Sequence, residues 1–285
     1  MMTFKIFLIF FFSFLSVSYS KIITLGGTVT EIVYGLGAGD KIVAVDLSSL
    51  NPLEARNLPQ VGYIRNVSLE GILSLEPTAV IASDSLGPKS VIGRLKKAGI
   101  KLKIIKSPQS VEETCNAINE ISSFLSLESK GKQLVDEIRI NYSQLNITNN
   151  RASAIFLMYN PGISGTFNAA GNHTKANSII EISGANNLAK GIHNGYKNLN
   201  IEGMLKLNPE VIFVGIPENT KLDKNHFLKL LSNDSILCEL SAVRNNRVYF
   251  LPLSKTLSFG HEVIDTIQYL NDCLYGNYLK DENEI

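Results

Sequence analysis

Short apolar runs alternate with amphipathic stretches along most of the chain. Uninterrupted apolar runs are typical of buried strands, whereas apolar residues spaced by three and four are typical of helices. Runs of the first kind lie at 22–25, 42–45, 79–82, 102–105, 154–158, 211–214 and 248–251. Helical patterns separate most of them, including 90–98, and a last one covers about 261–274. Because strands and helices alternate, the pattern favours an α/β fold in layers.

The first predicted strand runs into a glycine pair that ends with Gly27, and a helical pattern follows. Thr28 with Glu31 three residues later has the spacing of a capping box, so we expect a helix to begin at Thr28. It should end at Gly35 or Gly37. The free N–H groups and the positive dipole end of such a terminus suit a carboxylate, although the same turn occurs wherever a strand enters a helix tightly.

One long segment, from 110 to about 145, departs from the alternation. It contains no proline and a single glycine, Gly131, and apolar residues recur at helical spacing. We expect a long helical stretch that is bent or broken near 127–129.

An internal repeat indicates the domain organisation. Residues 69–83 read LEGILSLEPTAVIAS and residues 201–215 read IEGMLKLNPEVIFVG. Each copy is a short amphipathic helix, a proline that ends it and a buried strand, a combination that also arises by chance in α/β proteins. One copy precedes the long helix and one follows it. We therefore expect two similar Rossmann-like α/β lobes joined by a long linking helix, with a ligand cleft between the lobes. The expected limits are 21–109, 110–150 and 151–285.

Residues 1–20 have the features of a secretory signal peptide. They combine one lysine, an apolar run over 6–15 and the small polar residues Ser18 and Ser20 around a cleavage site. The run is short for a membrane span, which takes about 20 apolar residues. No cysteine lies near the predicted cut, so we expect cleavage and release without a lipid anchor.

Charge and motifs exclude several classes of function. Without residues 1–20, which hold one lysine, basic and acidic side chains balance at 26 each, so nucleic acid is not an expected partner. There is no G-x-S-x-G motif and the four histidines are isolated, so an enzyme is not expected. A zinc or manganese carrier would require scattered side chains to converge in space. Cys115, Cys238 and Cys273 lack metal or redox spacing and are predicted to be small core residues, although one pair could close in an oxidising compartment.

Four segments carry a family resemblance: IITLGGTVTEIVYGLGAGDKIVAVDLSS, LPQVGYIRNVSLEGILSLEPTAVIAS, AAGNHTKANSIIEISGANN and GYKNLNIEGMLKLNPEVIFV. They resemble the periplasmic haemin-binding proteins of ABC transporters, within a group that also contains cobalamin and siderophore binders. The resemblance extends from about residue 22 to the last helix. It implies a monomeric periplasmic carrier with little hinge motion, haem as ligand and a permease dimer as partner. The alternative is a cobalamin or ferric-siderophore carrier. Cobalamin clefts in this group are usually rich in Trp, and this chain has none.

The haem-specific part of the resemblance is the motif VGYIR, which contains Tyr63 and Arg65. In the resembling family a tyrosine at this position ligates the iron and the arginine hydrogen-bonds it. Tyrosinate is a known axial ligand of haem iron, and a nearby cation favours the ionised phenol. We expect Tyr63 to be the axial ligand. Without the resemblance, Tyr63 would be read as a half-buried loop aromatic and Arg65 as a surface charge.

In the second copy of the repeat, Tyr196 precedes the helix as Tyr63 does in the first. We expect Tyr196 to approach the cleft from the other lobe. Some members of the resembling family add a histidine near the strand at 154–158, where this chain has none. We therefore expect ligation by Tyr63 alone or with help from Tyr159, and regard the loop residues His173 and His193 as weak substitutes.

Candidate partners for the haem propionates are Gly27 and Thr28 at the first helix terminus, and Lys197 beside Tyr196. Glu70 and Glu202 occupy the same position in the two copies of the repeat. In the resembling group, one exposed acid per lobe docks onto arginines of the permease, so we expect this role for both. A solvated glutamate in a first helical turn, favoured by the dipole, is the simpler interpretation.

Overall fold

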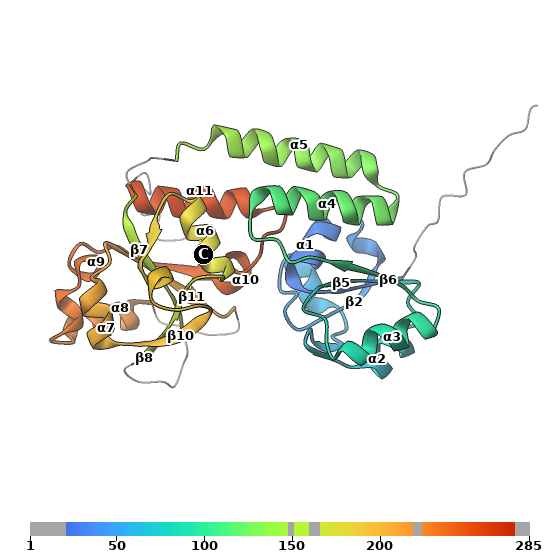
Figure 1. Ribbon diagram of the computed structural model, residues 1–285, viewed down its shortest axis with the longest axis horizontal. Coiled ribbons are helices and arrows are strands. Elements are labelled where there is room, and N and C mark those ends of the chain that lie inside the picture. Colours follow the sequence, from blue (N-terminus) through green and yellow to red (C-terminus); the bar gives the residue numbers. More distant parts are fainter. Residues whose placement is uncertain (1–20, 148–150, 160–165, 219–223, 277–285) are drawn as a thin grey trace, which may run out of the picture.

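The computed structural model describes residues 21–147, 151–159, 166–218 and 224–276 (Figure 1). The predicted signal peptide, residues 1–20, lies outside the described residues. Across the described ranges, no helix is both long and apolar enough to cross a membrane.

The first lobe is built on a parallel four-stranded sheet in the order β2-β1-β5-β6. Its strands are β1 (Ile22–Leu25), β2 (Ile42–Val45), β5 (Ala79–Ser83) and β6 (Lys101–Ile105). Every residue of β1 and β5 is buried, as expected for central strands covered by helices on both faces. The four strands predicted from apolar runs in this half are confirmed within one residue.

The second lobe has a mixed sheet in the order β10-β8-β7-β11-β12, with a short strand, β9 (Asn186–Asn187), beside β7. The other strands are β7 (Ser153–Met158), β8 (Thr166–Ala170), β10 (Tyr196–Asn200), β11 (Val211–Ile216) and β12 (Val248–Pro252). The parallel strands β7, β11 and β12 were predicted. Strands β8 and β10 were not predicted; they are antiparallel to their neighbours and contain several polar residues.

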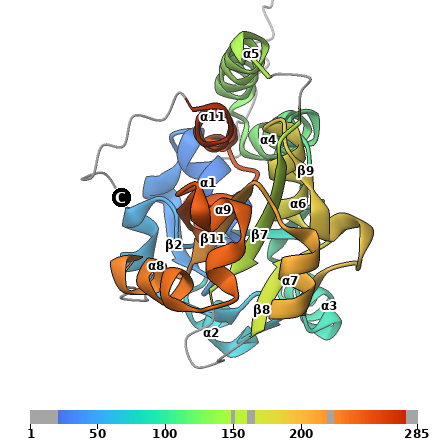
Figure 2. The same ribbon diagram turned by 90° about the vertical axis from the view of Figure 1, so that its left-hand side faces the viewer.

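Helices cover the sheets and join the lobes (Figures 1 and 2). Those of the first lobe are α1 (Gly27–Gly35), α2 (Leu69–Ser74) and α3 (Lys89–Lys97). Those of the linking region are α4 (Val111–Leu125) and α5 (Glu128–Gln144). Those of the second lobe are α6 (Lys175–Ile182), α7 (Ile201–Leu207), α8 (Lys224–Asn233), α9 (Ser241–Arg244), α10 (Leu253–Thr256) and α11 (Val263–Tyr275).

The predicted long helical stretch is confirmed, including its break. Ser126 adopts a left-handed conformation with φ 58°, which ends α4 and reverses the chain. Figure 1 shows α5 returning alongside α4 toward the second lobe, so the link between the lobes is a helical hairpin rather than a single rod.

The internal repeat corresponds to the same structural unit in both lobes. In the first lobe α2 leads into β5, and in the second α7 leads into β11. The helices begin alike, because the Ser68 hydroxyl accepts from the N–H of Gly71 and the Asn200 side chain accepts from that of Gly203.

The two lobes share part of their core. One apolar cluster combines buried residues of α1 and α4 with those of α6 and α11. Figures 1 and 2 show α4, α5 and α11 together along one side of both lobes. Two further clusters lie within one lobe each. The shared cluster makes the relative position of the lobes part of the folded core.

The capping box predicted at Thr28 and Glu31 is wrong. Helix α1 begins at Gly27 after Gly26, and no side chain caps it. The Thr28 hydroxyl and the Glu31 carboxylate instead bind groups of the second lobe, including the hydroxyl of Ser258. Contacts between distant segments have therefore replaced a local motif.

Candidate ligand-binding site

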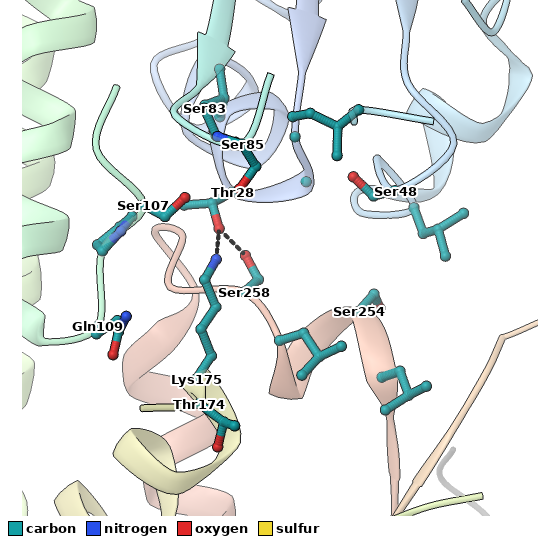
Figure 3. Close-up of a pocket in the computed structure, with 18 of the residues that line it drawn as sticks. Thr28, Ser48, Ser83, Ser85, Ser107, Gln109, Thr174, Lys175, Ser254 and Ser258 are labelled. Atoms are coloured by element: carbon teal, nitrogen blue, oxygen red, sulfur yellow. Dashed lines mark hydrogen bonds between the residues drawn. The ribbon is translucent and has the colours of Figure 1, made fainter. Parts of the chain in front are cut away.

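A cavity of about 620 Å³ lies between the lobes (Figure 3). In the first lobe its wall includes residues within three positions of the ends of β1, β2, β5 and β6, and in the second lobe residues that directly follow β11 and β12. The carboxyl ends of parallel strands are where α/β sheets commonly bind ligands. The volume is also within the usual range for small-molecule sites.

The turn between β1 and α1 brings main-chain groups to the cavity wall. Gly26 has φ 110°, which favours glycine, and a Cβ at Gly27 would lie 2.8 Å from the carbonyl oxygen of Ser48. The buried carboxylate of Asp46 holds the turn by accepting from the N–H of Gly26 at 2.7 Å. As predicted, Gly27 and Thr28 line the cavity.

Tyr63 lies at the cavity on a short hairpin of β3 (Gly62–Tyr63) and β4 (Asn66–Val67). The hairpin is anchored to the end of β2, since the N–H of Val61 donates to the carbonyl of Val45 and that of Leu47 to the carbonyl of Gly62, both at 3.0 Å. The Tyr63 side chain is 49% exposed. The hairpin thus presents the phenol to the cavity without burying it.

Arg65 follows on the same hairpin, also lines the cavity and is exposed. No hydrogen bond joins its guanidinium to the Tyr63 phenol in the part of the chain that the structure describes. The two groups share one wall of the cavity, as predicted, while the predicted hydrogen bond between them is not formed here.

Tyr196 lines the cavity from the second lobe, as predicted. Burial raises the pKa of Tyr196 to about 12, against hydrogen bonds from the N–H of Ala176 and the side chain of Thr174. Its phenol therefore meets the first turn of α6 and stays neutral near pH 7.

The structure corrects two of the predicted ligand contacts. Lys197 does not line the cavity, because successive side chains of a strand point to opposite faces and its neighbour Tyr196 occupies the cavity side. Tyr159 does not line it either. Its ring packs edge-to-face on Phe227, with centroids 5.9 Å apart, on the second lobe's own apolar cluster.

The two loop histidines differ. His173 lines the cavity, so it lies closer to the site than the sequence analysis expected. His193 does not, and its Nε2 lies 3.1 Å from the carbonyl oxygen of Ala169.

Lys175, which the sequence analysis missed, enters the cavity from the first turn of α6. Its Nζ donates to Oγ1 of Thr28 in the other lobe at 3.1 Å (Figure 3). Burial lowers the pKa of Lys175 to about 8, although the carboxylates of Glu31 and Asp84 favour the charged form. A lysine in the first turn opposes the helix dipole, and this was the signal in the sequence that could have revealed it.

The rest of the wall is amphipathic. Hydroxyl groups come from Thr28, Ser48, Ser83, Ser85, Ser107, Thr174, Ser254 and Ser258 (Figure 3). Apolar surface comes from Leu50, Ile64, Ile105, Leu253 and Leu257. Among the described lining residues, three basic side chains (Arg65, Lys106 and Lys175) face one acid, Glu218. This wall suits a ligand that combines an apolar body with negative charge.

Glu70 and Glu202 both lie in the first turn of their helices, α2 and α7, and both are exposed. Neither lines the cavity, and neither makes an ion pair with another described residue. Figures 1 and 2 show α2 and α7 on the side of the molecule opposite α5. The helices that carry the two carboxylates therefore lie on one side of the protein, one on each lobe.

The sequence had left open a metal site formed by scattered side chains and a disulfide between two cysteines, and the described residues show neither. The described residues contain no group of three or more His, Cys, Asp or Glu side chains that could hold a metal ion. Cys115, Cys238 and Cys273 are all free thiols, and Cys115 and Cys273 are buried. Burial raises the pKa of Cys273 to about 12, so its thiol stays protonated.

Two α/β lobes, a helical link and a cleft at the strand ends define a solute-binding protein. The sequence pattern of the family described as "Periplasmic binding protein" matches residues 22–254, and the chain belongs to this family. Its members are the solute-binding components of ABC transporters, which interact with a membrane permease and are not enzymes.

Three known proteins illustrate the similarity. The uncharacterized ABC transporter substrate-binding lipoprotein YvrC of Bacillus subtilis (strain 168) is 27% identical to this chain. The match covers 92% of this chain and 82% of YvrC. The vitamin B12-binding protein of Vibrio parahaemolyticus is also 27% identical, and the match covers 90% of this chain and 93% of that protein. The solved structure of the periplasmic haem-binding protein HutB of Vibrio cholerae is 28% identical, covers 90% of this chain and 98% of that one, and superposes with a TM-score of 0.78.

Proposed function

We propose that this protein binds haem in the cleft between its lobes and delivers it to the permease of an ABC transporter. The observation that carries the proposal is the position of Tyr63, whose phenol is presented to the cavity by a hairpin anchored to β2. The similarity to HutB, whose name states that it binds haem, supports the same ligand.

Tyr63 has the chemistry that ferric haem requires. A phenol that loses its proton to Fe(III) becomes a hard anionic oxygen ligand. Arg65 lines the same wall of the cavity as Tyr63. The apolar side chains of the wall would contact the porphyrin, and the N–H groups near Gly27 and Thr28 would donate hydrogen bonds to a propionate.

The family membership also supports the proposed setting. We propose that residues 1–20 are removed on export and that the protein works as a monomer in the periplasm, with lobes at about 21–109 and 151–285. Glu70 and Glu202 would each bind one subunit of the permease dimer, because both are exposed on one side of the molecule.

Vitamin B12 is the second candidate ligand, since several relatives are named vitamin B12-binding proteins. Its corrin carries neutral amide side chains, which make less use of the basic side chains Arg65 and Lys175 on the wall. The test is to titrate the purified mature protein with haemin and, separately, with cyanocobalamin. The proposal predicts a shifted Soret band and a one-to-one endpoint with haemin only. Saturable binding of cyanocobalamin without any response to haemin would replace haem by vitamin B12.

A further inference from the structure

The ammonium of Lys175 is a cavity group that the proposed axial ligation leaves unused. Its Nζ donates to the Thr28 hydroxyl at 3.1 Å, and no described carboxylate lies within ion-pair distance. Lys106 differs, because it pairs with Glu113 at 2.8 Å and is largely exposed. Of these two lysines, only Lys175 is half-buried in the cavity wall and without an ion-pair partner among the described residues.

A lysine ammonium carries three donors. One is directed to Thr28, and the residue lines the cavity, so two donors remain for a group that enters there. Burial of a cation without an anion destabilises the empty protein. An anionic ligand group at this place would supply the missing partner, and charge-assisted hydrogen bonds are the stronger kind.

An anionic group bound to Lys175 would also lie beside the uncapped N-terminus of α1. Gly27, Thr28 and Val29 line the same cavity, and no side chain caps this helix. Thr28 links the two features, since it belongs to the first turn of α1 and accepts from Nζ of Lys175. A carboxylate beside Thr28 would therefore meet both the ammonium and the helix terminus.

We propose that Lys175 recognises an ionised carboxylate of the ligand, and that binding is accompanied by uptake of a proton from solvent at its Nζ. The proposal rests on haem as the ligand, where the carboxylate is a propionate. It also provides a basis for discrimination, since vitamin B12 offers amides in place of carboxylates.

The pH dependence follows from the state of the empty protein. With a pKa of about 8, Lys175 is mostly charged below pH 8 and loses its proton above it. A bound carboxylate raises this pKa, so affinity is highest below pH 8 and falls as the pH rises above it. Glu31 and Asp84 favour the charged form in the empty protein. The other titratable groups on the wall are Tyr63, Arg65, Lys106, His173, Tyr196 and Glu218.

Haemin and haemin dimethyl ester separate this effect from iron ligation, because the ester keeps the iron and lacks the carboxylates. We would measure the dissociation constants of both for the wild type, Lys175→Met and Lys197→Met between pH 6.5 and about 9.5, a range that spans the pKa of Lys175. Methionine keeps most of the length and the apolar stem of lysine. Lys197 provides the matched control, because it is a lysine of the same lobe, on β10, that does not line the cavity.

The expected result is that Lys175→Met weakens haemin binding roughly 10- to 100-fold and leaves ester binding nearly unchanged. In the wild type, the preference for haemin over its ester should fall as the pH rises past 8, and Lys175→Met should remove that trend. Equal losses for both ligands would show that Lys175 only holds the lobes together, and would overturn the inference while haem binding stands. Absence of binding of either ligand to the wild type would instead refute the proposed function, and the inference with it.

Discussion

The hydroxyl of Ser258 donates to Oε2 of Glu31 at 2.6 Å, which joins the second lobe to the first beneath the cavity. The Glu31 carboxylate is buried and also accepts from the N–H of Glu262 at 3.1 Å. His261 Nδ1 lies 3.6 Å from its other oxygen. A rotation that opened the cleft would leave a buried carboxylate without these partners, which is costly.

We therefore expect the lobes to move little when the ligand binds. The shared apolar cluster of α1, α4, α6 and α11 opposes the same motion. Small-angle scattering of the wild type with and without haemin should give nearly the same radius of gyration. A clear decrease on binding would contradict this expectation and indicate a hinge.

Tyr63→Phe should remove most high-affinity haemin binding, because it deletes the proposed iron ligand and keeps the ring. The loss should exceed the roughly 10- to 100-fold typical of an outer hydrogen-bond partner of a metal ligand. Tyr196→Phe should cost less, since the Tyr196 phenol is bonded to the first turn of α6 and its raised pKa disfavours the phenolate that iron ligation requires. Tyr142→Phe, on α5 away from the cavity, is the control.

The visible spectrum of the haemin complex should be high-spin and of the tyrosinate type. His173 lines the cavity and is the group that could add a second ligand. The spectrum of His173→Ala should therefore match that of the wild type. A low-spin wild-type spectrum that becomes high-spin in His173→Ala would show that both lobes ligate the iron.

Glu70→Ala and Glu202→Ala should each weaken stimulation of the transporter ATPase, and the double variant should nearly abolish it. Loss of one partner of a desolvated charge pair costs on the order of 2–5 kcal/mol, whereas a pair at the rim costs little. Haemin affinity should be unchanged, because neither residue lines the cavity.

The matched control for docking is Glu137→Ala, an exposed carboxylate on α5, on the opposite side of the protein. The assay uses reconstituted transporter and haemin-loaded protein. Normal haem delivery by the Glu70 and Glu202 double variant would mean that the repeat reflects only the similarity of the lobes.

Lys175→Met should stabilise the empty protein at neutral pH, by up to about 3 kcal/mol, since each pKa unit corresponds to about 1.4 kcal/mol. The folded state lowers the pKa of Lys175 from 10.5 to about 8, so the penalty is fully present below pH 8. It disappears as the pH rises from 8 to 10.5, where the unfolded chain binds more protons. Urea unfolding of both proteins at pH 7 and near pH 10.5 would measure the difference. An equal difference at both values would assign the effect to packing.

Local patterns predicted most of the elements and part of the site. The apolar runs identified the parallel strands, and the repeat identified α2 and α7 with Glu70 and Glu202 at equivalent positions. The motif around Tyr63 and the turn at Gly27 also lie on the cavity as expected. The strands, the helices and the turn could be predicted because burial and turn geometry act on residues that are close in the chain, whereas Tyr63 was expected at the cleft because of the family resemblance.

The same reasoning failed where distant segments meet. The antiparallel strands β8 and β10 contain polar residues, and their pairing depends on a sheet edge formed elsewhere in the chain. Tyr159 was expected at the cleft, but Phe227 provides a nearer apolar partner within its own lobe.

The amino-acid sequence by itself determined the two lobes and their helical link, because hydrophobic periodicity and short motifs involve residues that are neighbours in the chain. The tyrosine at the cleft was expected from the resemblance of its segment to a known family. The tertiary structure alone decided the electrostatics of the site. Thr28 binds Lys175 of the other lobe rather than capping its own helix. Desolvation and charge depend on which groups lie nearby in space, and most of those groups are far apart in the chain.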